Sequence, residues 1–485
     1  MIYALVPILV LALCLYLGKR LATLVVIIAY LNVEGFFKLL SNYNRVVHVG
    51  MDIVVLGVAA MWVADAVVRR RAGIAELPWM RLILFYALWV VLQVLSPMSP
   101  GFIPTVASFK LHLTMIALYF MTAAVIRKRE DVVWLFAALV AVALLPYAVA
   151  LVQYALGPRS VVDLSPRFAL GLRGYHEWRP FGTSAGPGGT SVVAFLVTPL
   201  AVALLIISNA GRRTRLLAAL SVALAVGVFF VSGVRNVFLG CLLALLVMIL
   251  LVGIRQRARG LVAIAIVSLL GLGAYTGVQA ILRPMATQAL LTDPDVPGMW
   301  RQNSITDRLG TLRDPRVFLT ARPGGLKAIY VRAVHYPFGT GLGRIGPGAA
   351  ALQGIMGTDP EYDRIARELG YTENFFAVMI QEVGLPGVVM LTILLVGLPV
   401  TALRQARRTP HPVTLATSAA IAGVFLAVLV MSWGAQPLTG NPISGYYWLL
   451  AGVLAALART ERDAQETAHE PARAPTFNAA RTLLA

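Results

Sequence analysis

The sequence is poor in charge and in cysteine. Only 13% of its 485 residues are charged, whereas 59% are hydrophobic. A soluble chain carries about twice that charged fraction, so the composition excludes an ordinary soluble multi-domain protein. The two cysteines, Cys14 and Cys241, stand alone in separate apolar runs. They predict neither a disulfide framework nor a metal site, and we expect both to serve in packing.

Metal-ligand spacing and a cleavable leader are also missing from the sequence. None of the six histidines pairs with another at the spacing of metal ligands, so neither a metal nor another cofactor is expected. Residues 2–17 are apolar, but no basic segment precedes them and no small-residue cleavage site follows. We therefore expect a retained helix there. No internal repeat is evident that would favour an inverted-repeat transporter.

Long apolar runs dominate what is present. Runs of about 17 to 22 residues recur, each long enough to cross a hydrocarbon core of about 30 Å. Backbone polar groups in lipid must be hydrogen-bonded within the segment, so these runs are predicted to be helices. The predicted fold class is an all-α polytopic membrane protein with about 12–13 transmembrane helices. After the first run, the others begin near Leu21, Val47, Trp79, Ala107, Val132, Ser191, Leu216, Val237, Leu261, Phe375, Val413 and Pro442.

Basic residues exceed acidic ones and give a net charge of +19. They form short clusters on every second connection between apolar runs, which is how membrane proteins are oriented, and the positive-inside rule puts these clusters in the cytoplasm. Nucleic-acid binding is not expected, because no groove-reading element accompanies the charge. The clusters are Lys19/Arg20, Arg69/Arg70/Arg71, Arg127/Lys128/Arg129, Arg212/Arg213/Arg215, Arg255/Arg257/Arg259, Arg404/Arg407/Arg408 and Arg459/Arg462.

The charge pattern divides the chain into four parts. The N-terminus, an outer loop at 157–190 and a large insertion are predicted to lie outside. The large insertion includes an expected amphipathic helix at 360–370 and a basic segment at 301–332, which either lies on headgroups or grips an anionic substrate. The parts are residues 1–282 with N-terminal transmembrane helices, 283–372 with the large outer loop, 373–458 with C-terminal transmembrane helices, and 459–485 with a disordered cytoplasmic tail.

Two arginines stand at predicted outer membrane edges. Arg235 lies in S-G-V-R-N-V between two apolar runs, where a cation needs a partner or a role, although snorkelling to the headgroups also explains it. Arg179 lies in W-R-P-F-G-T-S-A-G-P-G-G-T, just before another run. The glycines and proline are expected to leave backbone N–H groups free at the start of the helix, which favours an anion. An ordinary membrane-entry loop is the alternative.

A third arginine follows a glycine-rich stretch in the large loop. Y-P-F-G-T-G-L-G-R contains Gly339, Gly341, Gly343 and Arg344. It is not a dinucleotide fingerprint, because no strand precedes it and it is predicted to lie outside the cell. A tight loop that brings backbone and one cation near a ligand remains open. The D-P-D sequence at 293–295 is interpreted as a turn rather than a metal site.

One carboxylate marks the end of the large loop. Glu373 precedes the run that begins at Phe375. An acid in the first turn is favoured by the helix dipole, and that alone explains its position. The chemical alternative is a general base at the membrane edge that takes a proton from a sugar hydroxyl.

Taken together, these features resemble the superfamily of O-antigen ligases and O-antigen/exopolysaccharide polymerases (Wzy/WaaL). The resemblance spans residues 179–448. Ligases of that superfamily end their large loop with H-[N/S/Q]-x9-G-x-x-G; here Asn374, Gly384 and Gly387 keep the spacing, while Glu373 replaces the histidine. S-G-V-R-N is similar to the family's S-R-type motif at Arg235. R-P-F-G-T resembles its other arginine motif, and P-F-G-T-G-L-G its P-x-G-x-G segment.

The resemblance implies a GT-C-type glycosyltransferase that needs neither metal nor nucleotide. Its donor is an undecaprenyl-diphosphate-linked saccharide and its acceptor another saccharide, on the periplasmic side of the bacterial inner membrane, in O-antigen or exopolysaccharide synthesis. Other polysaccharide-assembly proteins are further candidate partners. The residues it implies are Glu373 as catalytic base, Arg179, Arg235 and Arg344 for the diphosphate, and Asn374, Gly339, Gly341, Gly343, Gly384 and Gly387 in support.

Three alternatives remain at this stage. Replacement of the histidine by Glu373 favours a polymerase, but a ligase that transfers to lipid A core is still open. A polytopic transporter of an anionic solute would use the same arginines along a path and predicts ionisable residues near mid-bilayer. Most charges of this chain are instead expected at membrane edges, and the exceptions, Asp52, Asp65 and Lys110, are expected near the ends of apolar runs. A non-catalytic scaffold whose outer loop binds partners is the third alternative.

Overall fold

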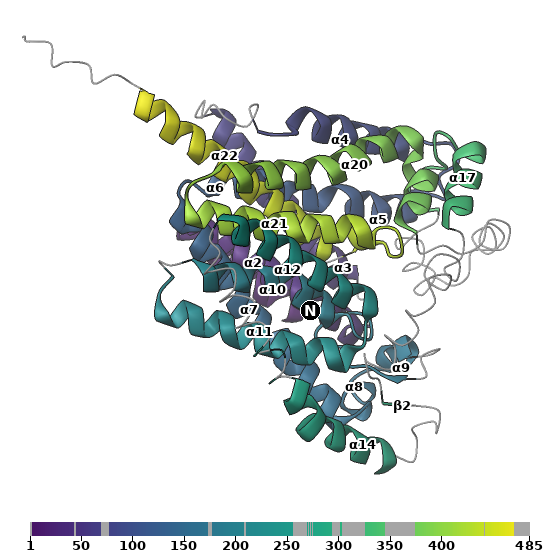
Figure 1. Ribbon diagram of the computed structural model, residues 1–485. Coiled ribbons are helices and arrows are strands. Elements are labelled where there is room, and N and C mark those ends of the chain that lie inside the picture. The colour runs from purple at the N-terminus through teal and green to yellow at the C-terminus, as the bar shows by residue number, and fades with distance from the viewer. Residues whose placement is uncertain are drawn as a thin grey trace, which may run out of the picture.

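The chain folds into a bundle of helices (Figure 1). The computed structural model describes residues 2–42, 45–68, 77–172, 177–207, 210–255, 269, 271, 273, 275–292, 301–302, 325–344, 374–440 and 442–469. The N-terminal half contains α1 (Ile2–Tyr16), α2 (Arg20–Leu40), α3 (Arg45–Val68), α4 (Met80–Val94), α5 (Phe102–Leu113), η1 (Thr114–Ile116), α6 (Ala117–Val125), α7 (Arg129–Leu156), α8 (Arg159–Val162), α9 (Pro166–Leu172), β1 (Glu177–Trp178), α10 (Thr190–Ile206) and α11 (Arg212–Ser232). The remainder contains α12 (Arg235–Arg255), η2 (Val278–Leu282), α14 (Arg283–Thr292), β2 (Arg301–Gln302), α17 (Gly325–His335), α20 (Phe375–Arg408), α21 (Pro412–Met431), η4 (Pro437–Thr439) and α22 (Ile443–His469).

The all-α polytopic prediction is confirmed. Seven helices among the described residues are long and apolar enough to cross a membrane, and shorter apolar helices accompany them at 52–62, 80–94 and 190–206. Most predicted runs begin within a few residues of an observed helix. The run near Leu261 lies largely outside the described residues, so the predicted total of about 12–13 spans stays a prediction. The seven are Arg20–Leu40, Pro104–Val125, Arg129–Leu156, Arg212–Ser232, Arg235–Gly253, Phe375–Arg408 and Pro412–Met431.

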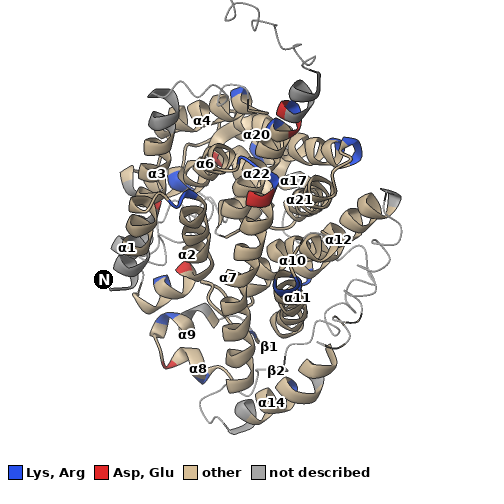
Figure 2. Cartoon of the chain, turned by 90° about the vertical axis from the view of Figure 1, so that its left-hand side faces the viewer, with Lys and Arg blue, Asp and Glu red and all other residues tan. Residues whose placement is uncertain are grey.

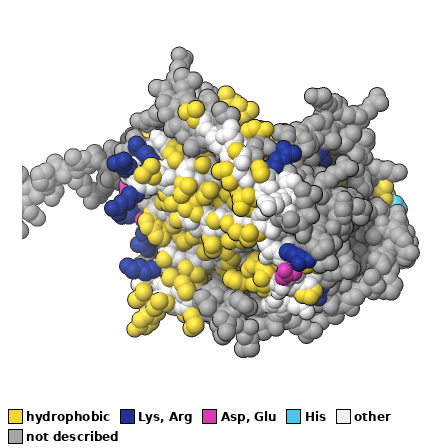
Figure 3. All heavy atoms as spheres, turned by 90° about the horizontal axis from the view of Figure 1, so that it is seen from below, with side chains coloured by type: hydrophobic (Ala, Val, Ile, Leu, Met, Phe, Trp, Pro, Cys, Tyr) yellow, Lys and Arg dark blue, Asp and Glu magenta, His cyan; other side chains and the backbone are white. Residues whose placement is uncertain are grey.

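The outer surface of the bundle is apolar where a bilayer would surround it. Phe85 and Leu88 on α4 are 62% and 56% exposed, and Leu216 and Leu220 on α11 are exposed as well. Figure 3 shows a broad area of hydrophobic side chains with lysine and arginine along its left edge. A soluble protein would not expose so large an apolar area, whereas lipid tails accept it. A lipid bilayer is therefore the environment of this chain.

Small residues let the central helices approach closely. A Cβ on Gly423 of α21 would clash with the backbone of Ala244 in α12, and one on Gly452 of α22 would lie 2.6 Å from the Tyr119 carbonyl oxygen in α6. Without a hydrophobic driving force between helices in lipid, such close backbone contact is what stabilises their association. Cys241 is buried beside this contact as a free thiol, and Cys14 is half-buried, in keeping with the packing role expected of both.

Three of the predicted basic clusters meet at one end of the bundle, which we call the basic end. Arg459 donates to the carbonyl oxygens of Ala123 and Ile126 at 3.0 and 2.8 Å, next to the cluster at 127–129. One cavity there is lined by Arg129, Thr401, Arg404, Gln405, Arg408, Thr409, Pro410, His411, Pro412, Ala458, Glu461 and Arg462. Figure 2 looks onto this end and shows charged residues on α20 and α22. Because α7 and α21 begin here while α20 and α22 run toward it, their other ends form the opposite end of the bundle, which we call the loop end.

One expectation about the C-terminal segment is wrong, and part of the large insertion is described. Residues 459–469 continue α22 and are not disordered; Thr460 bonds the Ala456 carbonyl oxygen at 3.0 Å, while Arg459 anchors the helix to α6. Residues 470–485 lie outside the described part of the chain.

The large insertion includes α14 and α17, and β2 pairs in parallel with β1. The expected helix at 360–370 and the D-P-D turn lie outside the described residues.

Candidate active site

The loop that carries Arg179 is held between α7 and α2. The side-chain amide of Gln153 bonds both backbone groups of Gly182, at 2.7 and 3.0 Å. Thr183 Oγ1 donates to the Asn32 carbonyl oxygen at 2.6 Å. Arg179 is only 8% exposed. The loop is therefore fixed by helices on both sides, three and four residues after Arg179.

The same loop rests on the turn that carries Arg235. Gly188 has φ +75° and donates its N–H to the Pro180 carbonyl oxygen at 2.8 Å. A Cβ on Gly188 would lie 2.7 Å from Val234 Cγ2. Pro180 follows Arg179 directly and Val234 precedes Arg235 directly, so a single chain of contacts links the backbones of the two arginine motifs. The structure thus brings together two motifs that lie 56 residues apart in the sequence.

The expectation of free amides at the start of α10 is wrong for four residues. Gly188 bonds Pro180 as described, and Gly189, Ser191 and Val192 donate to carbonyl oxygens three residues earlier, at 3.0 to 3.1 Å. The glycine-rich stretch folds into consecutive turns that use these N–H groups internally. An anion at this loop would therefore be held by the guanidinium group rather than by these amides.

A kink in α20 organises a second part of the loop end. Gly384 has φ +69° and ψ 177°, which interrupts the helix and leaves nearby backbone groups without their helical partners. The loop at 337–340 supplies new ones: the Thr340 N–H donates to the Gln381 carbonyl oxygen at 2.6 Å, and the Leu385 N–H donates to Pro337 at 2.8 Å. The G-x-x-G and P-x-G-x-G stretches of the sequence are therefore in direct contact.

The three alternating glycines of this loop are required by conformation and by space. All three have φ between +81° and +84°, a region that side chains disfavour. A Cβ on Gly339 would lie 2.8 Å from the Gly384 nitrogen, and one on Gly341 would lie 2.7 Å from Ser96 Cβ. A Cβ on Gly343 would clash with the Pro104 backbone. The prediction of a tight loop at Gly339–Arg344 is confirmed by this geometry.

A buried carboxylate that the sequence reasoning did not single out fixes this loop. Glu382 is 1% exposed. One carboxylate oxygen accepts from Ser108 Oγ at 2.9 Å and from the Gly343 N–H at 3.3 Å. The other lies 2.9 Å from His112 Nε2, and His112 Nδ1 lies 2.8 Å from the Tyr86 hydroxyl. We call these five groups the kink cluster. Its signal in the sequence was present, since Glu382 and His112 are both ionisable residues inside apolar runs.

The basic segment of the large loop also differs from expectation where it is described. Arg332 in α17 is 1% exposed, and its Nε donates to Gln381 Oε1 at 3.1 Å. It therefore joins α17 to α20 rather than lying on headgroups or facing solvent. Burial lowers the pKa of Arg332, although an arginine stays charged at this depth.

The start of α20 lies beside the end of α21. Asn374 Oδ1 caps the helix by accepting from the Ala377 N–H at 3.1 Å, and Asn374 Nδ2 donates to the Trp433 carbonyl oxygen at 2.9 Å. A Cβ on Gly240 in α12 would lie 2.7 Å from Met431 Sδ at the end of α21. The residue after Glu373 is thus tied to a helix that packs within two turns of Arg235. Glu373 itself lies outside the described residues.

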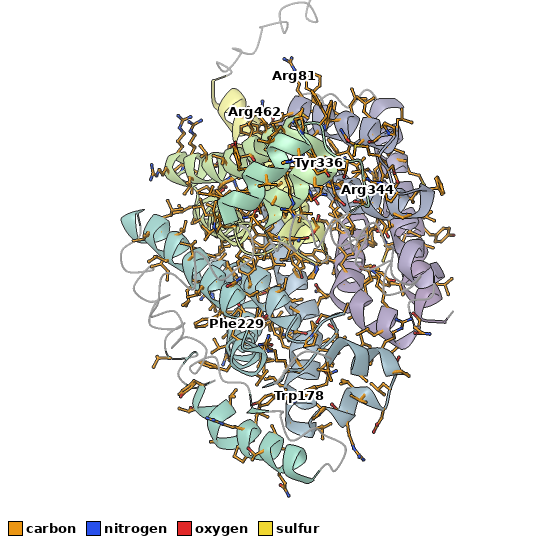
Figure 4. The ribbon with its side chains drawn as sticks, turned by 90° about the vertical axis from the view of Figure 1, so that its right-hand side faces the viewer. Arg81, Trp178, Phe229, Tyr336, Arg344 and Arg462 are labelled. Atoms are coloured by element: carbon orange, nitrogen blue, oxygen red, sulfur yellow. The ribbon has the colours of Figure 1, made fainter. Side chains whose placement is uncertain are left out.

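Arg344 belongs to a different part of the loop end from Arg179. It follows Gly343, which is fixed to α20 and α5 by the kink cluster, whereas the Arg179 loop is fixed to α2 and α7. Figure 4 shows Arg344 well away from Trp178, the residue before Arg179. Arg344 is therefore not part of the contact that joins the Arg179 loop to the Arg235 turn. Gly387, the last glycine of the G-x-x-G stretch, packs against Val383 and Trp89.

Within the described ranges, no three His, Cys, Asp or Glu side chains lie together in a way that could hold a metal ion. The groups that are brought together at the loop end are cations, a capping amide and a buried carboxylate–imidazole pair. Of these groups, the cations can bind an anion and stabilise negative charge that develops on it.

Replacing Gly35 by alanine is expected to displace the Arg179 loop. The new Cβ would clash with the backbone nitrogen of Ala185 and lie 2.9 Å from Ser184 Cα. We expect a loss of about 1–3 kcal/mol and faster proteolysis at 177–189. Gly57→Ala is the matched control, since it is also helical and has open space around it. Thermal unfolding and limited proteolysis of both variants measure the effect; equal behaviour would contradict the close docking of this loop.

Comparison with known proteins gives this chain no family. The sequence matches no protein-family model, and it matches no curated protein.

Proposed function

We propose that this chain is a membrane glycosyltransferase that polymerises undecaprenyl-diphosphate-linked saccharide units at the loop end. The observation that carries the proposal is the contact of Gly188 with Val234, which unites the Arg179 loop with the Arg235 turn. Two guanidinium-bearing segments on one edge of an apolar bundle suit a ligand with a charged head and a lipid tail. A lipid-linked diphosphate is such a ligand.

The proposed chemistry is a displacement at the anomeric carbon. The acceptor hydroxyl oxygen forms the new glycosidic bond, the bond from the anomeric carbon to the diphosphate oxygen breaks, and undecaprenyl diphosphate leaves with the electron pair. Arg179 and Arg235 stabilise the charge on the leaving group, for which bidentate guanidinium geometry is well suited. The proton of the acceptor hydroxyl passes to the carboxylate of Glu373 as general base.

The kink cluster has a positioning role in this proposal. Its groups are buried and bonded to one another, so they do not reach a substrate at the loop end. They fix the bend of α20, and the first turn of α20 follows Glu373. Asn374 fixes the other end of that segment through its bond to Trp433.

The acceptor and the location follow from the same assignment. A carboxylate at the position of the family histidine favours a polymerase, with transfer to lipid A core as the alternative. The positive-inside rule puts the basic end in the cytoplasm of a bacterial cell and the loop end in the periplasm. Other polysaccharide-assembly proteins of the inner membrane are the proposed partners.

The proposal is tested by ligand binding and by the product of the pathway. The full chain in lipid nanodiscs is expected to bind undecaprenyl diphosphate about tenfold more tightly than undecaprenyl phosphate, because the second phosphate adds a charge for the paired arginines. A strain that lacks the chain is expected to accumulate lipid-linked saccharide. Equal binding of the two lipids together with normal polymer in the deletion strain would rule the proposal out.

A transporter of an anionic solute is the second candidate, and one observation favours it. Lys110 and Asp52 form a partly buried ion pair at 2.7 Å, and two residues further along α5 the buried His112 faces Glu382. Buried ionisable pairs on one membrane helix are typical of ion pathways. Proteoliposomes that take up a charged sugar, without turnover of lipid-linked saccharide, would favour this candidate over the enzyme.

A further inference from the structure

The basic end of the bundle contains a cavity that the proposed reaction does not use. It has a volume of about 790 Å³ and lies among α7, α20, α21 and α22, at the end seen in Figure 2. Segments far apart in the sequence supply its charged lining. These are Arg129, Arg404, Arg408 and Arg462, with Glu461 as the carboxylate among the lining residues.

Polar atoms in the wall of this cavity have no partner within the protein. Gln405 is 9% exposed, and both its side-chain nitrogen and its side-chain oxygen are buried without a hydrogen bond. Arg129 Nε and His411 Nδ1 are likewise buried without a hydrogen bond. A buried polar group left unbonded costs about 1–3 kcal/mol, so several together in one wall point to a ligand that satisfies them.

Arginines that only orient a membrane protein extend into water. Those at 404 and 408 are exposed, but they stand one turn apart above the buried Gln405 and face arginines from α7 and α22 across the same cavity. From the kink at Gly384 to Arg408, α20 is about 36 Å long at 1.5 Å per residue. A hydrocarbon core is about 30 Å thick, so the cavity lies at the level of the headgroups.

We propose that this cavity binds the phosphate of an anionic lipid headgroup. Four guanidinium groups against one carboxylate favour an anion, and their planar fork matches phosphate oxygens in pairs. The Gln405 amide nitrogen and Arg129 Nε donate to the remaining oxygens. Pro410, Pro412 and Ala458 line the same space and contact the carbon atoms of the glycerol backbone. Basic pockets between membrane helices on the cytoplasmic side are suited to such headgroups.

His411 makes the binding depend on pH. Burial and the nearby Arg129 lower its pKa, while Glu461 and Glu130 act in the opposite direction. Arg404 and Arg408 from α20 and Arg462 from α22 also line the cavity that His411 faces. A bound phosphate favours the imidazolium form, so lipid affinity is expected to rise as the pH falls through the pKa of His411. A His411→Gln variant is expected to lose this pH dependence.

The experiment uses the full chain in a neutral detergent. Retention of phosphatidylglycerol and of phosphatidylcholine is measured by native mass spectrometry. In parallel, the protection against heat that inorganic phosphate gives is measured at about 10 mM, a concentration on the order of the Kd of a weak anion site. Arg404→Gln combined with Arg408→Gln is expected to lower phosphatidylglycerol retention about tenfold. Arg407→Gln is the matched control, because it lies on the same turn and does not line the cavity.

Each outcome either supports or overturns the proposed headgroup site. The headgroup site is supported if the double variant selectively loses phosphatidylglycerol while Arg407→Gln retains it. Both variants must keep an intact fold. An equal loss in the control would mean that the whole basic end attracts anionic lipid without a built site, which overturns the proposal. Protection by inorganic phosphate without any preference for phosphatidylglycerol overturns it in favour of a soluble ligand. Gln405→Leu, which fills the wall without polar atoms, is a second variant with the same expected loss.

Discussion

Replacing Arg235 by alanine is expected to lower the turnover of lipid-linked saccharide by about 100- to 1,000-fold, the usual cost of removing one preorganised charge from a leaving-group site. Arg235 is the first residue of α12 and follows the turn on which Gly188 rests. Because the Arg179 loop rests on this turn, the start of α12 is fixed in place and a neighbouring side chain cannot take the position of Arg235. Turnover in membranes of a complemented deletion strain measures the effect.

Two further variants separate charge from geometry at this position. Arg235→Lys keeps the charge but loses the planar fork, so we expect turnover between those of the wild type and the alanine variant. Arg213→Ala at the other end of α11 removes an exposed arginine and is expected to leave turnover unchanged. Wild-type polymer from Arg235→Ala, in a protein that is folded and inserted, would remove Arg235 from the mechanism.

Replacing Glu382 by alanine is expected to cost about 3–5 kcal/mol of stability. The carboxylate is buried and bonded by Ser108, His112 and the Gly343 N–H, so its removal takes one hydrogen-bond partner from each of three polar groups at once. The loop at 337–343 then loses one of its attachments to α20. We expect a large fall in the midpoint of thermal unfolding, measured in detergent by fluorescence, and loss of protection of this loop against proteases.

The kink cluster also predicts how variants combine. Glu382→Gln keeps the shape and one acceptor oxygen and is expected to cost less than Glu382→Ala. His112→Ala added to Glu382→Ala is expected to cost less than the sum of the two, because the partners of a buried pair do not act independently. Glu130→Ala on the exposed start of α7 is the control and is expected to stay within about 0.5 kcal/mol of the wild type. Additive effects of Glu382 and His112 would show that they do not form one unit.

Much of the architecture was predictable because it depends on local properties of the chain. Hydropathy over about 20 residues decides where a membrane helix forms, and the observed helices begin close to the predicted residues. Arg459, Arg129 and Arg404 were expected on the same side from charge alone, and they meet at the basic end. Gly384 and the P-F-G-T-G-L-G loop were both named from the resemblance, and the kink brings Gly384 against Phe338.

What the sequence by itself determined, then, is that the chain is a helical membrane protein with basic connections and a few polar motifs at helix ends. Only the tertiary structure decided that the Arg179 loop rests on the turn before Arg235, that Arg344 lies elsewhere, that Glu382 is a buried anchor, and that Gln405 lines a polar cavity. The physical reason is the distance along the sequence over which each property is decided. Helix formation in lipid depends on neighbouring residues, whereas the partner of a polar group is chosen by which helices pack together, and residues hundreds of positions apart set that choice.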